Sequence, residues 1–259
     1  MKASIAKKRL EDIFGKPLIP EEEQLSSLVY WYPILLDIGM RVPKTIIVHR
    51  GLSDLSGMLD GKAIPREFNE RLIAAMKEIG FPCFMRTGQT SYKHGWKNTC
   101  FIERQEDVAS HVYRLLEASA MANIAGRPFS CDFWAIREMI PTTPLLTYFD
   151  GMPIALEVRF FINGGKVQCV HPYWPQEAFT TDDANIHKKV KALQIFVKSK
   201  DEVYQMAEYV ALYFNGYWSV DFLQGTNGDW WCIDMGTGGR SWHWPTCEYV
   251  KSIGNTRRR

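Results

Sequence analysis

Residues 217–235 spell YWSVDFLQGTNGDWWCIDM, and this stretch decides the fold. Two apolar runs flank Asn227-Gly228, the dipeptide that most strongly favours a tight β-hairpin, because a type I′ turn needs two residues at positive φ. If these two residues form the centre of the turn, the register places Asp221 directly opposite Asp234. The sequence therefore predicts an antiparallel strand pair that carries two facing carboxylates.

The predicted register also decides what surrounds these carboxylates. It puts Trp230 and Cys232 on the face that carries Asp221 and Asp234, and Trp231 on the opposite face. Like charges directly opposite each other destabilise a sheet, so the pair needs compensation. Magnesium, which is commonly held by one or two carboxylates and substrate phosphates, is one solution. A raised pKa on one Asp, or arginine partners in a structural salt-bridged pair, is the alternative.

A second polar pair interrupts an apolar strand. Within residues 154–162 the alternation places Glu157 and Arg159 on one face and the apolar side chains on the other. The two polar side chains could simply be solvated. They could also line a polar cleft, where arginine binds phosphate or carboxylate through two parallel hydrogen bonds.

Two further segments are candidates for nucleotide contacts. Arg86 ends a predicted strand and opens a loop, residues 87–97, that combines small residues with Lys93 and Lys97. Small residues let a backbone approach phosphates, although a solvated basic loop fits the same pattern and no Walker motif is present. Residues 136–140 end a strand just before a proline, where free backbone groups could pair with a base or simply mark a strand end.

The whole chain of 259 residues is 46% hydrophobic, which is enough for one large domain or two packed lobes. Helical spacing of apolar residues predicts helices over residues 65–79, 107–118 and 203–213. Strands are predicted over residues 46–48, 83–86, 99–103, 132–140, 154–162, 217–223 and 230–235. Strands and helices alternate irregularly and include hairpins, so we expect an α+β fold with antiparallel sheets.

Composition excludes several classes of protein. The net charge of +2 does not indicate a nucleic-acid partner, and no apolar stretch is long enough to span a membrane. Residues 1–11 lack the apolar core of a secretory signal, so we expect a cytoplasmic protein. The six cysteines are scattered with no CxxC pair, which favours reduced buried thiols over a zinc site. Arg257–Arg259 are either a solvated tail or a basic anchor.

Taken in order along the chain, these segments resemble the ATP-grasp superfamily. The resemblance rests on residues 32–45, the cationic strand ending at Arg86, the strand end at residues 136–140, Glu157-x-Arg159 and the two acidic strands. The chain is similar to small stand-alone ATP-grasp proteins of phages and bacteria, and more distantly to eukaryotic cell-division-cycle assembly factors of this superfamily. The resemblance implies a pre-grasp segment (1–60), a small lobe (61–141) and a large lobe with the metal site (142–259).

The resemblance further implies that ATP and magnesium bind between the two lobes. Magnesium would lie on Asp221 and Asp234, and Arg159 and Arg240 would act in catalysis. The residues implied to contact the nucleotide are Arg86, Lys97, Glu138, Met139, Ile140 and Glu157. The chain departs from the usual pattern at two positions, with Arg86 in place of a lysine and Gly236 in place of the asparagine that supplies a third metal ligand.

Our leading expectation for function is an ATP- and magnesium-dependent carboxylate–amine ligase that forms an acyl phosphate. Its substrates would be a small-molecule or peptide carboxylate and an amine acceptor. One alternative is an ATP-binding module without ligase activity that binds or helps to assemble a partner protein. Another is a kinase that stops at phosphorylation.

Overall fold

The computed structural model describes residues 25–126 and 129–256. Within these ranges every strand pair is antiparallel, and the strands form two four-stranded sheets and one short hairpin, so the expected α+β class is confirmed. No helix among these residues is long and apolar enough to cross a membrane. The expectations for residues 1–11 and for Arg257–Arg259 concern segments outside the described residues.

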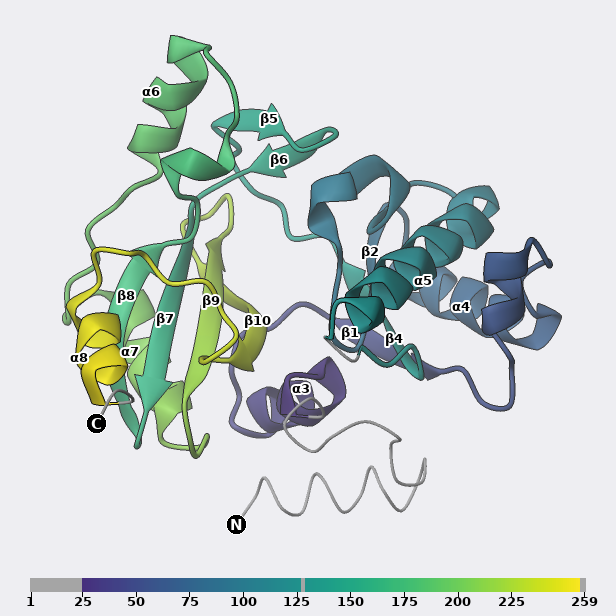
Figure 1. Ribbon diagram of the computed structural model, residues 1–259, viewed down its shortest axis with the longest axis horizontal. Helices are drawn as coiled ribbons and strands as arrows, with labels where there is room; N and C mark the ends of the chain where they lie inside the picture. The colour runs from purple at the N-terminus through teal and green to yellow at the C-terminus, as the bar shows by residue number, and fades with distance from the viewer. Residues whose placement is uncertain (1–24, 127–128, 257–259) are drawn as a thin grey trace.

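The first sheet has the strand order β1-β4-β2-β3 and is covered on one face by two helices (Figure 1). Apolar side chains from that face pack with buried residues of both helices, such as Phe68 and Val112. The opposite face carries Arg86 and Arg137 toward the second sheet. The elements are β1 (Thr45–His49), β2 (Cys83–Thr87), β3 (Phe101–Ile102), β4 (Phe133–Glu138), α4 (Arg66–Ile79) and α5 (Val108–Ile124).

The second sheet has the strand order β10-β9-β7-β8. Its apolar face packs on α7, and the chain's first described helix, α3, lies between the two sheets and shares this core (Figure 1). The apolar stretch that forms α3 contains Pro33, and its pattern does not predict a helix. The elements are β7 (Glu157–Asn163), β8 (Lys166–Pro172), β9 (Trp218–Gln224), β10 (Trp230–Thr237), α3 (Leu28–Asp37) and α7 (Glu202–Ala211).

A third, smaller apolar cluster joins the hairpin of β5 and β6 to helix α6 and to the aromatic side chains of Trp96 and Trp174. The strand predicted over residues 154–162 is divided here, because Ile154 ends β6 and β7 begins only at Glu157. The remaining elements are β5 (Leu146–Tyr148), β6 (Met152–Ile154), α6 (Ala184–Ala192), α8 (Glu248–Thr256) and the 3₁₀ helices η1 (Ser56–Asp60), η2 (Lys93–Asn98), η3 (Gln105–Asp107) and η4 (Gln176–Ala178).

The hairpin of β9 and β10 confirms that Asp221 lies opposite Asp234, but it reaches this register in another way. The turn holds three residues rather than two, since the amide of Gly225 donates to the carbonyl of Asp229 and Gly228 has a φ of +81°. This longer turn shifts the pairing by one residue. A β-bulge at Ile233, between Cys232 and Asp234, shifts it back.

The predicted surroundings of the carboxylates were therefore wrong. Before the bulge Trp231 pairs with Leu223 and Cys232 pairs with Phe222. Trp230 and Cys232 pack into the apolar core with Phe222 and do not share a face with the carboxylates. Ile233 is the bulged residue, and it faces the space between the two sheets.

The division of the chain at residues 60 and 141 stays a prediction. Strand β1, in the segment predicted to precede the small lobe, pairs along its whole length with β4 of the first sheet.

Candidate active site

The two facing carboxylates are each held by an arginine. Both carboxylate oxygens of Asp221 accept hydrogen bonds from Arg159, with Nε–Oδ1 and Nη2–Oδ2 distances of 2.7 Å. Oδ1 of Asp234 accepts from Nη1 of Arg86 at 2.8 Å and from the amide of Met235 at 3.0 Å. Arginine partners, one of the alternatives for this pair, are therefore present at both positions.

The two carboxylates differ in their access to solvent. The side chain of Asp234 is 37% exposed and lines a pocket, whereas that of Asp221 is 5% exposed. Burial tends to raise the pKa of Asp234, but the charges of Arg86, Arg137 and Lys93, with the hydrogen bond from Arg86, together hold that pKa below its ordinary value. Asp234 thus offers an ionised, accessible oxygen, which is the kind of ligand that magnesium prefers. The carboxylate of Asp221 keeps lone pairs that the two hydrogen bonds from Arg159 do not use, so it retains acceptor capacity for a cation.

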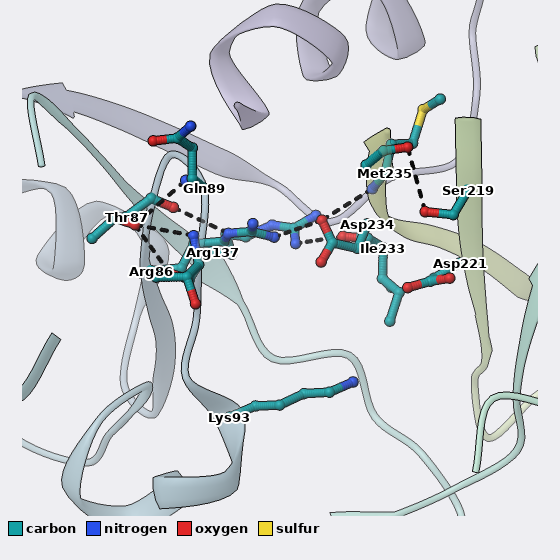
Figure 2. Close-up of polar contacts among 12 residues, drawn as sticks. Arg86, Thr87, Gln89, Lys93, Arg137, Ser219, Asp221, Ile233, Asp234 and Met235 are labelled. Carbon is teal, nitrogen blue, oxygen red and sulfur yellow. Dashed lines mark hydrogen bonds and ion pairs between the residues drawn. The ribbon is translucent and has the colours of Figure 1, made fainter. Parts of the chain in front are cut away.

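Arg137 places a second buried guanidinium beside Arg86 (Figure 2). Its Nη1 donates to the carbonyl of the bulged Ile233 at 2.7 Å, while its Nη2 is buried and has no hydrogen-bond partner among the described residues. Burial and the nearby charge of Arg86 lower the pKa of Arg137 to about 10. Two neighbouring buried cations, one with an unpaired donor, form a site suited to an anion such as phosphate.

Lys93 supplies a third cation from η2. Its Nζ lies 3.3 Å from Oε1 of Glu157 and stands over the rings of Tyr173 and Trp174, at 3.9 and 4.8 Å from their centroids. Burial raises the pKa of Glu157 to about 7, and Asp221 adds to this rise while Lys93 opposes it. Burial by itself would lower the pKa of Lys93, but Glu157 and Tyr173 raise it above its ordinary value. Lys93 therefore stays charged.

The end of β4 forms one edge of the pocket. The side chain of Glu138 accepts a hydrogen bond from the amide of Lys44 at 2.6 Å, and its own amide donates to the carbonyl of Lys44. In the part of the chain that the structure describes, Met139 and Ile140 make no backbone hydrogen bond. Their free donors and acceptors suit the polar edge of a heterocyclic base.

These groups surround a single pocket between the two sheets. The lining combines charged side chains, such as Arg86 and Asp234, with apolar ones, such as Phe84 and Met152. The lining residues are Pro43, Phe84, Arg86, Ser91, Lys93, Trp96, Arg137, Glu138, Met139, Ile140, Thr142, Met152, Pro153, Ala155, Glu157, Trp174, Leu223, Ile233 and Asp234.

The structure places most of the predicted site residues around this pocket. Arg159 and Asp221 form their ion pair beside the pocket and are not part of its lining. Lys97 and Arg240 are exposed and lie outside the lining, so their functions stay predictions. The predicted residues that line the pocket are Arg86, Glu138, Met139, Ile140, Glu157 and Asp234.

Sequence reasoning did not assign Lys93 and Arg137 to the site. Lys93 lies in the loop that was recognised as basic, but the pattern could not separate it from Lys97. Arg137 directly precedes the predicted Glu138. The signal that could have identified it is a charged residue inside an apolar strand, since such a residue is rarely buried without a partner.

The loop after β10 lies on the Asp221 side of the site. The hydroxyl of Ser241 is 2.6 Å from that of Ser219, a neighbour of Asp221 on β9. Nη1 of Arg159 donates to the carbonyl of Trp242 at 3.5 Å, so this loop contacts the same arginine as Asp221 does.

Comparison with known proteins gives a family match. The model of the ATP-grasp domain, R2K clade family 3, matches residues 75–253. No curated protein matches the chain by sequence.

Solved structures with low sequence identity are also similar to the chain. C-terminally truncated Cdc123 from Schizosaccharomyces pombe has a TM-score of 0.54 at 13% identity, over 85% of this chain and 87% of that one. A RimK domain ATP-grasp protein from Sphaerobacter thermophilus has a TM-score of 0.48 at 13% identity, over 99% and 72% of the two chains. D-alanyl-alanine synthetase A from Vibrio cholerae has a TM-score of 0.48 at 10% identity, over 98% and 67%. At this identity the similarity to Cdc123 concerns the fold alone.

Proposed function

Because this chain belongs to the ATP-grasp family, R2K clade family 3, we propose that it is an ATP- and magnesium-dependent carboxylate–amine ligase. One observation carries the proposal. Arg137, whose buried Nη2 has no hydrogen-bond partner among the described residues, lines a pocket that also holds Arg86, Lys93 and the accessible carboxylate of Asp234. Cations that neutralise phosphates, next to a carboxylate that can hold their magnesium, are what a nucleotide triphosphate requires.

The opposite side of the pocket supports the placement of the base. The free backbone groups of Met139 and Ile140 suit the amino group and ring nitrogen of adenine. Apolar side chains such as Phe84 and Met152 would cover its two faces. Glu138 would help by holding the strand end in place through Lys44.

The proposed reaction has two steps. An oxygen of the substrate carboxylate attacks the γ-phosphorus of ATP, and ADP leaves. The nitrogen of a neutral amine then attacks the acyl carbon, phosphate leaves, and the amine releases a proton as the amide forms. Arg159, beside Asp221, would stabilise the charge on the transferring phosphoryl group. Arg240, in the loop after β10, would act on the acceptor side.

Magnesium, when bound, would neutralise the charge that develops on the phosphate oxygens. Asp234 would be its main ligand, and Asp221 would contribute through an oxygen shared with Arg159. Arg86 would act in two ways in this arrangement. It orients Asp234 through a hydrogen bond, and its positive charge would face the phosphates.

Measuring ADP release tests the proposal directly. The enzyme is incubated with ATP, with and without magnesium, and with pools of amino acids and short peptides as acid and amine. Asp234→Asn should lower turnover by about 100-fold or more, a typical cost of losing one electrostatic contact in a transition state. Asp229→Asn, in the same hairpin but exposed, is the matched control and should keep full activity. Full turnover in Asp234→Asn would contradict the proposal.

A second candidate function has one observation in its favour. Both oxygens of Asp221 are engaged by Arg159, and Gly236 offers no side-chain ligand, so few metal ligands are immediately available. This arrangement favours an ATP-binding module that acts on a partner protein. Tight binding of ATP and magnesium without ADP release for any acceptor pair would support the module. Accumulation of a phosphorylated acid would instead identify a kinase.

A further inference from the structure

Four side chains with metal-ligand chemistry meet outside the nucleotide pocket. Cys169 and His171 lie two residues apart on β8, and His243 and Cys247 lie between β10 and α8. One ligand atom from each side chain lies within 4.8 Å of the other three. This is the one group of three or more such side chains found among the described residues. The two pairs are far apart in sequence, which is why the spacing of the cysteines favours reduced buried thiols over a zinc site.

We infer that Cys169, His171, His243 and Cys247 bind one Zn²⁺ ion in a tetrahedral site. Two thiolates and two imidazoles are a ligand set that closes a structural zinc site, and their charges cancel that of the ion. With Zn–S of about 2.3 Å and Zn–N of about 2.0–2.1 Å, ligand atoms in a tetrahedron lie roughly 3.3–3.8 Å apart. The widest pair would therefore close by about 1 Å on binding.

The local contacts leave ligand positions open on both histidines. Nε2 of His171 and Nδ1 of His243 are buried and have no hydrogen-bond partner within the described chain. Nε2 of His243 lies 2.7 Å from the hydroxyl of Tyr217 and 3.9 Å from Sγ of Cys169. A metal would therefore bind either the unpartnered Nδ1, with Tyr217 holding Nε2, or Nε2 after displacing the hydroxyl of Tyr217. Outer partners of this kind orient metal-bound histidines. The ring of Phe161 stacks on His243 with centroids 3.5 Å apart and limits its rotation.

The ion would link the C-terminal segment, through His243 and Cys247, to strand β8 of the second sheet, through Cys169 and His171. Helix α8 lies beside the edge of this sheet (Figure 1), where Tyr249 accepts a hydrogen bond from Asn163 at the end of β7. The indole of Trp244 donates to the carbonyl of Pro172 at 2.9 Å. Because His243 directly follows Trp242, whose carbonyl contacts Arg159, the zinc site would also fix the loop beside the nucleotide pocket. This function is structural and does not depend on the reaction proposed above.

Cobalt binding tests the inference on the full chain. The protein is purified under reducing conditions, stripped with a chelator and titrated with Co²⁺. We expect one ion per chain, with the absorption of a tetrahedral cobalt site, a thiolate-to-cobalt charge-transfer band, and displacement by Zn²⁺. The double variant Cys169→Ser/Cys247→Ser should lose these bands, and Cys131→Ser, a cysteine outside the cluster, should keep them. An unchanged spectrum in the double variant would overturn the inference.

Thiol alkylation of the native chain keeps the test decisive if the double variant does not fold. Zn²⁺ should slow the modification of Cys169 and Cys247, measured by peptide mass spectrometry, and leave Cys131 unaffected. Equal rates with and without Zn²⁺, or a Cys169–Cys247 disulfide in the reduced preparation, would refute the site. Neither readout involves ATP, so failure of the zinc site and failure of the ligase proposal are distinguishable.

Discussion

At the scale of single residues, Glu157 is a buried carboxyl group whose charge is disfavoured by its surroundings. Its pKa of about 7 lies above the value of 4.5 for an exposed glutamate. Folding therefore favours the protonated form. The resulting stabilisation is complete below pH 4.5, and it is lost as the pH rises to about 7.

We expect Glu157→Gln to remove this pH dependence. In the native chain the free energy of unfolding should fall between pH 4.5 and 7 relative to the variant, because the amide side chain of the variant has no proton to lose. Urea unfolding at several pH values measures the difference. Glu177→Gln, at an exposed residue of η4, is the control and should follow the native curve. Parallel curves for Glu157→Gln and the native chain would show that this carboxyl group does not titrate in the window.

Arg137 is the residue on which the phosphate site depends most. Arg137→Lys keeps a positive charge but cannot bond both the carbonyl of Ile233 and a phosphate through a planar fork. Loss of one charge-assisted hydrogen bond costs about 1.5–3 kcal/mol, so the Kd for ATP should rise by about tenfold or more. Isothermal titration calorimetry measures it. Arg41→Lys, at an exposed residue near the hairpin turn, should leave the affinity unchanged, and equal affinities in both variants would contradict the phosphate contact.

Sequence patterns could locate Arg86, Glu157, Asp221 and Asp234, because each interrupts an apolar strand at a regular position. The same patterns could not tell which arginine bonds which aspartate. The bond between Arg86 and Asp234 spans 148 residues, and the bond between Arg159 and Asp221 spans 62. Such partners are chosen by the packing of strands and sheets, which periodicity within one strand does not report.

At the scale of elements, the β9–β10 hairpin depends on a glycine in the left-handed region. Gly228 has a φ of +81°, and among the described residues a Cβ there would meet no atom within 4 Å. Gly228→Ala should therefore destabilise the protein through its backbone alone, by about 1–2 kcal/mol. Thermal unfolding measures this loss.

Gly239→Ala is the matched control for that substitution. A Cβ at Gly239 would also meet no described atom within 4 Å, but this glycine does not have a positive φ. The free energy of unfolding of Gly239→Ala should stay within about 0.5 kcal/mol of that of the native chain. A loss as large as that of Gly228→Ala would show that the left-handed backbone is not the cause.

In the same hairpin the predicted pairing of Asp221 with Asp234 is correct, but the predicted two-residue turn is not. A two-residue turn at Asn227-Gly228 and a regular ladder would align Asp221 with Asp234. The protein instead combines a three-residue turn with a bulge at Ile233, and the two shifts cancel. The bulge turns Ile233 toward the pocket, and its carbonyl accepts from Arg137, so tertiary contacts stabilise the irregular strand.

At the scale of the whole molecule, polar bonds join the first sheet and η2 to the second sheet across the pocket. Arg86 bonds Asp234 and Arg137 bonds the carbonyl of Ile233 (Figure 2). Lys93 bonds Glu157. A nucleotide bound among these groups would hold both sheets at once. ATP with magnesium should therefore stabilise the entire fold.

At a concentration 100 times its Kd, ATP with magnesium should add about 2.7 kcal/mol to the free energy of unfolding. For a protein of this size the Tm should rise by roughly 5–10 °C. Differential scanning calorimetry with ATP, with and without magnesium, measures the shift. In Asp234→Asn, adding magnesium to ATP should give no further rise in Tm. An unchanged Tm at saturating ATP and magnesium would contradict binding between the sheets.

The sequence by itself determined the α+β class, most of the strands and helices, and the opposition of two aspartates in one hairpin. These features depend on side-chain period and turn chemistry, which act over a few residues. Only the tertiary structure decided which arginine neutralises which carboxylate and that Lys93 and Arg137 face the pocket. It also brought two scattered cysteines and two histidines together. These contacts join distant segments, and their geometry follows from how the two sheets and the C-terminal segment pack.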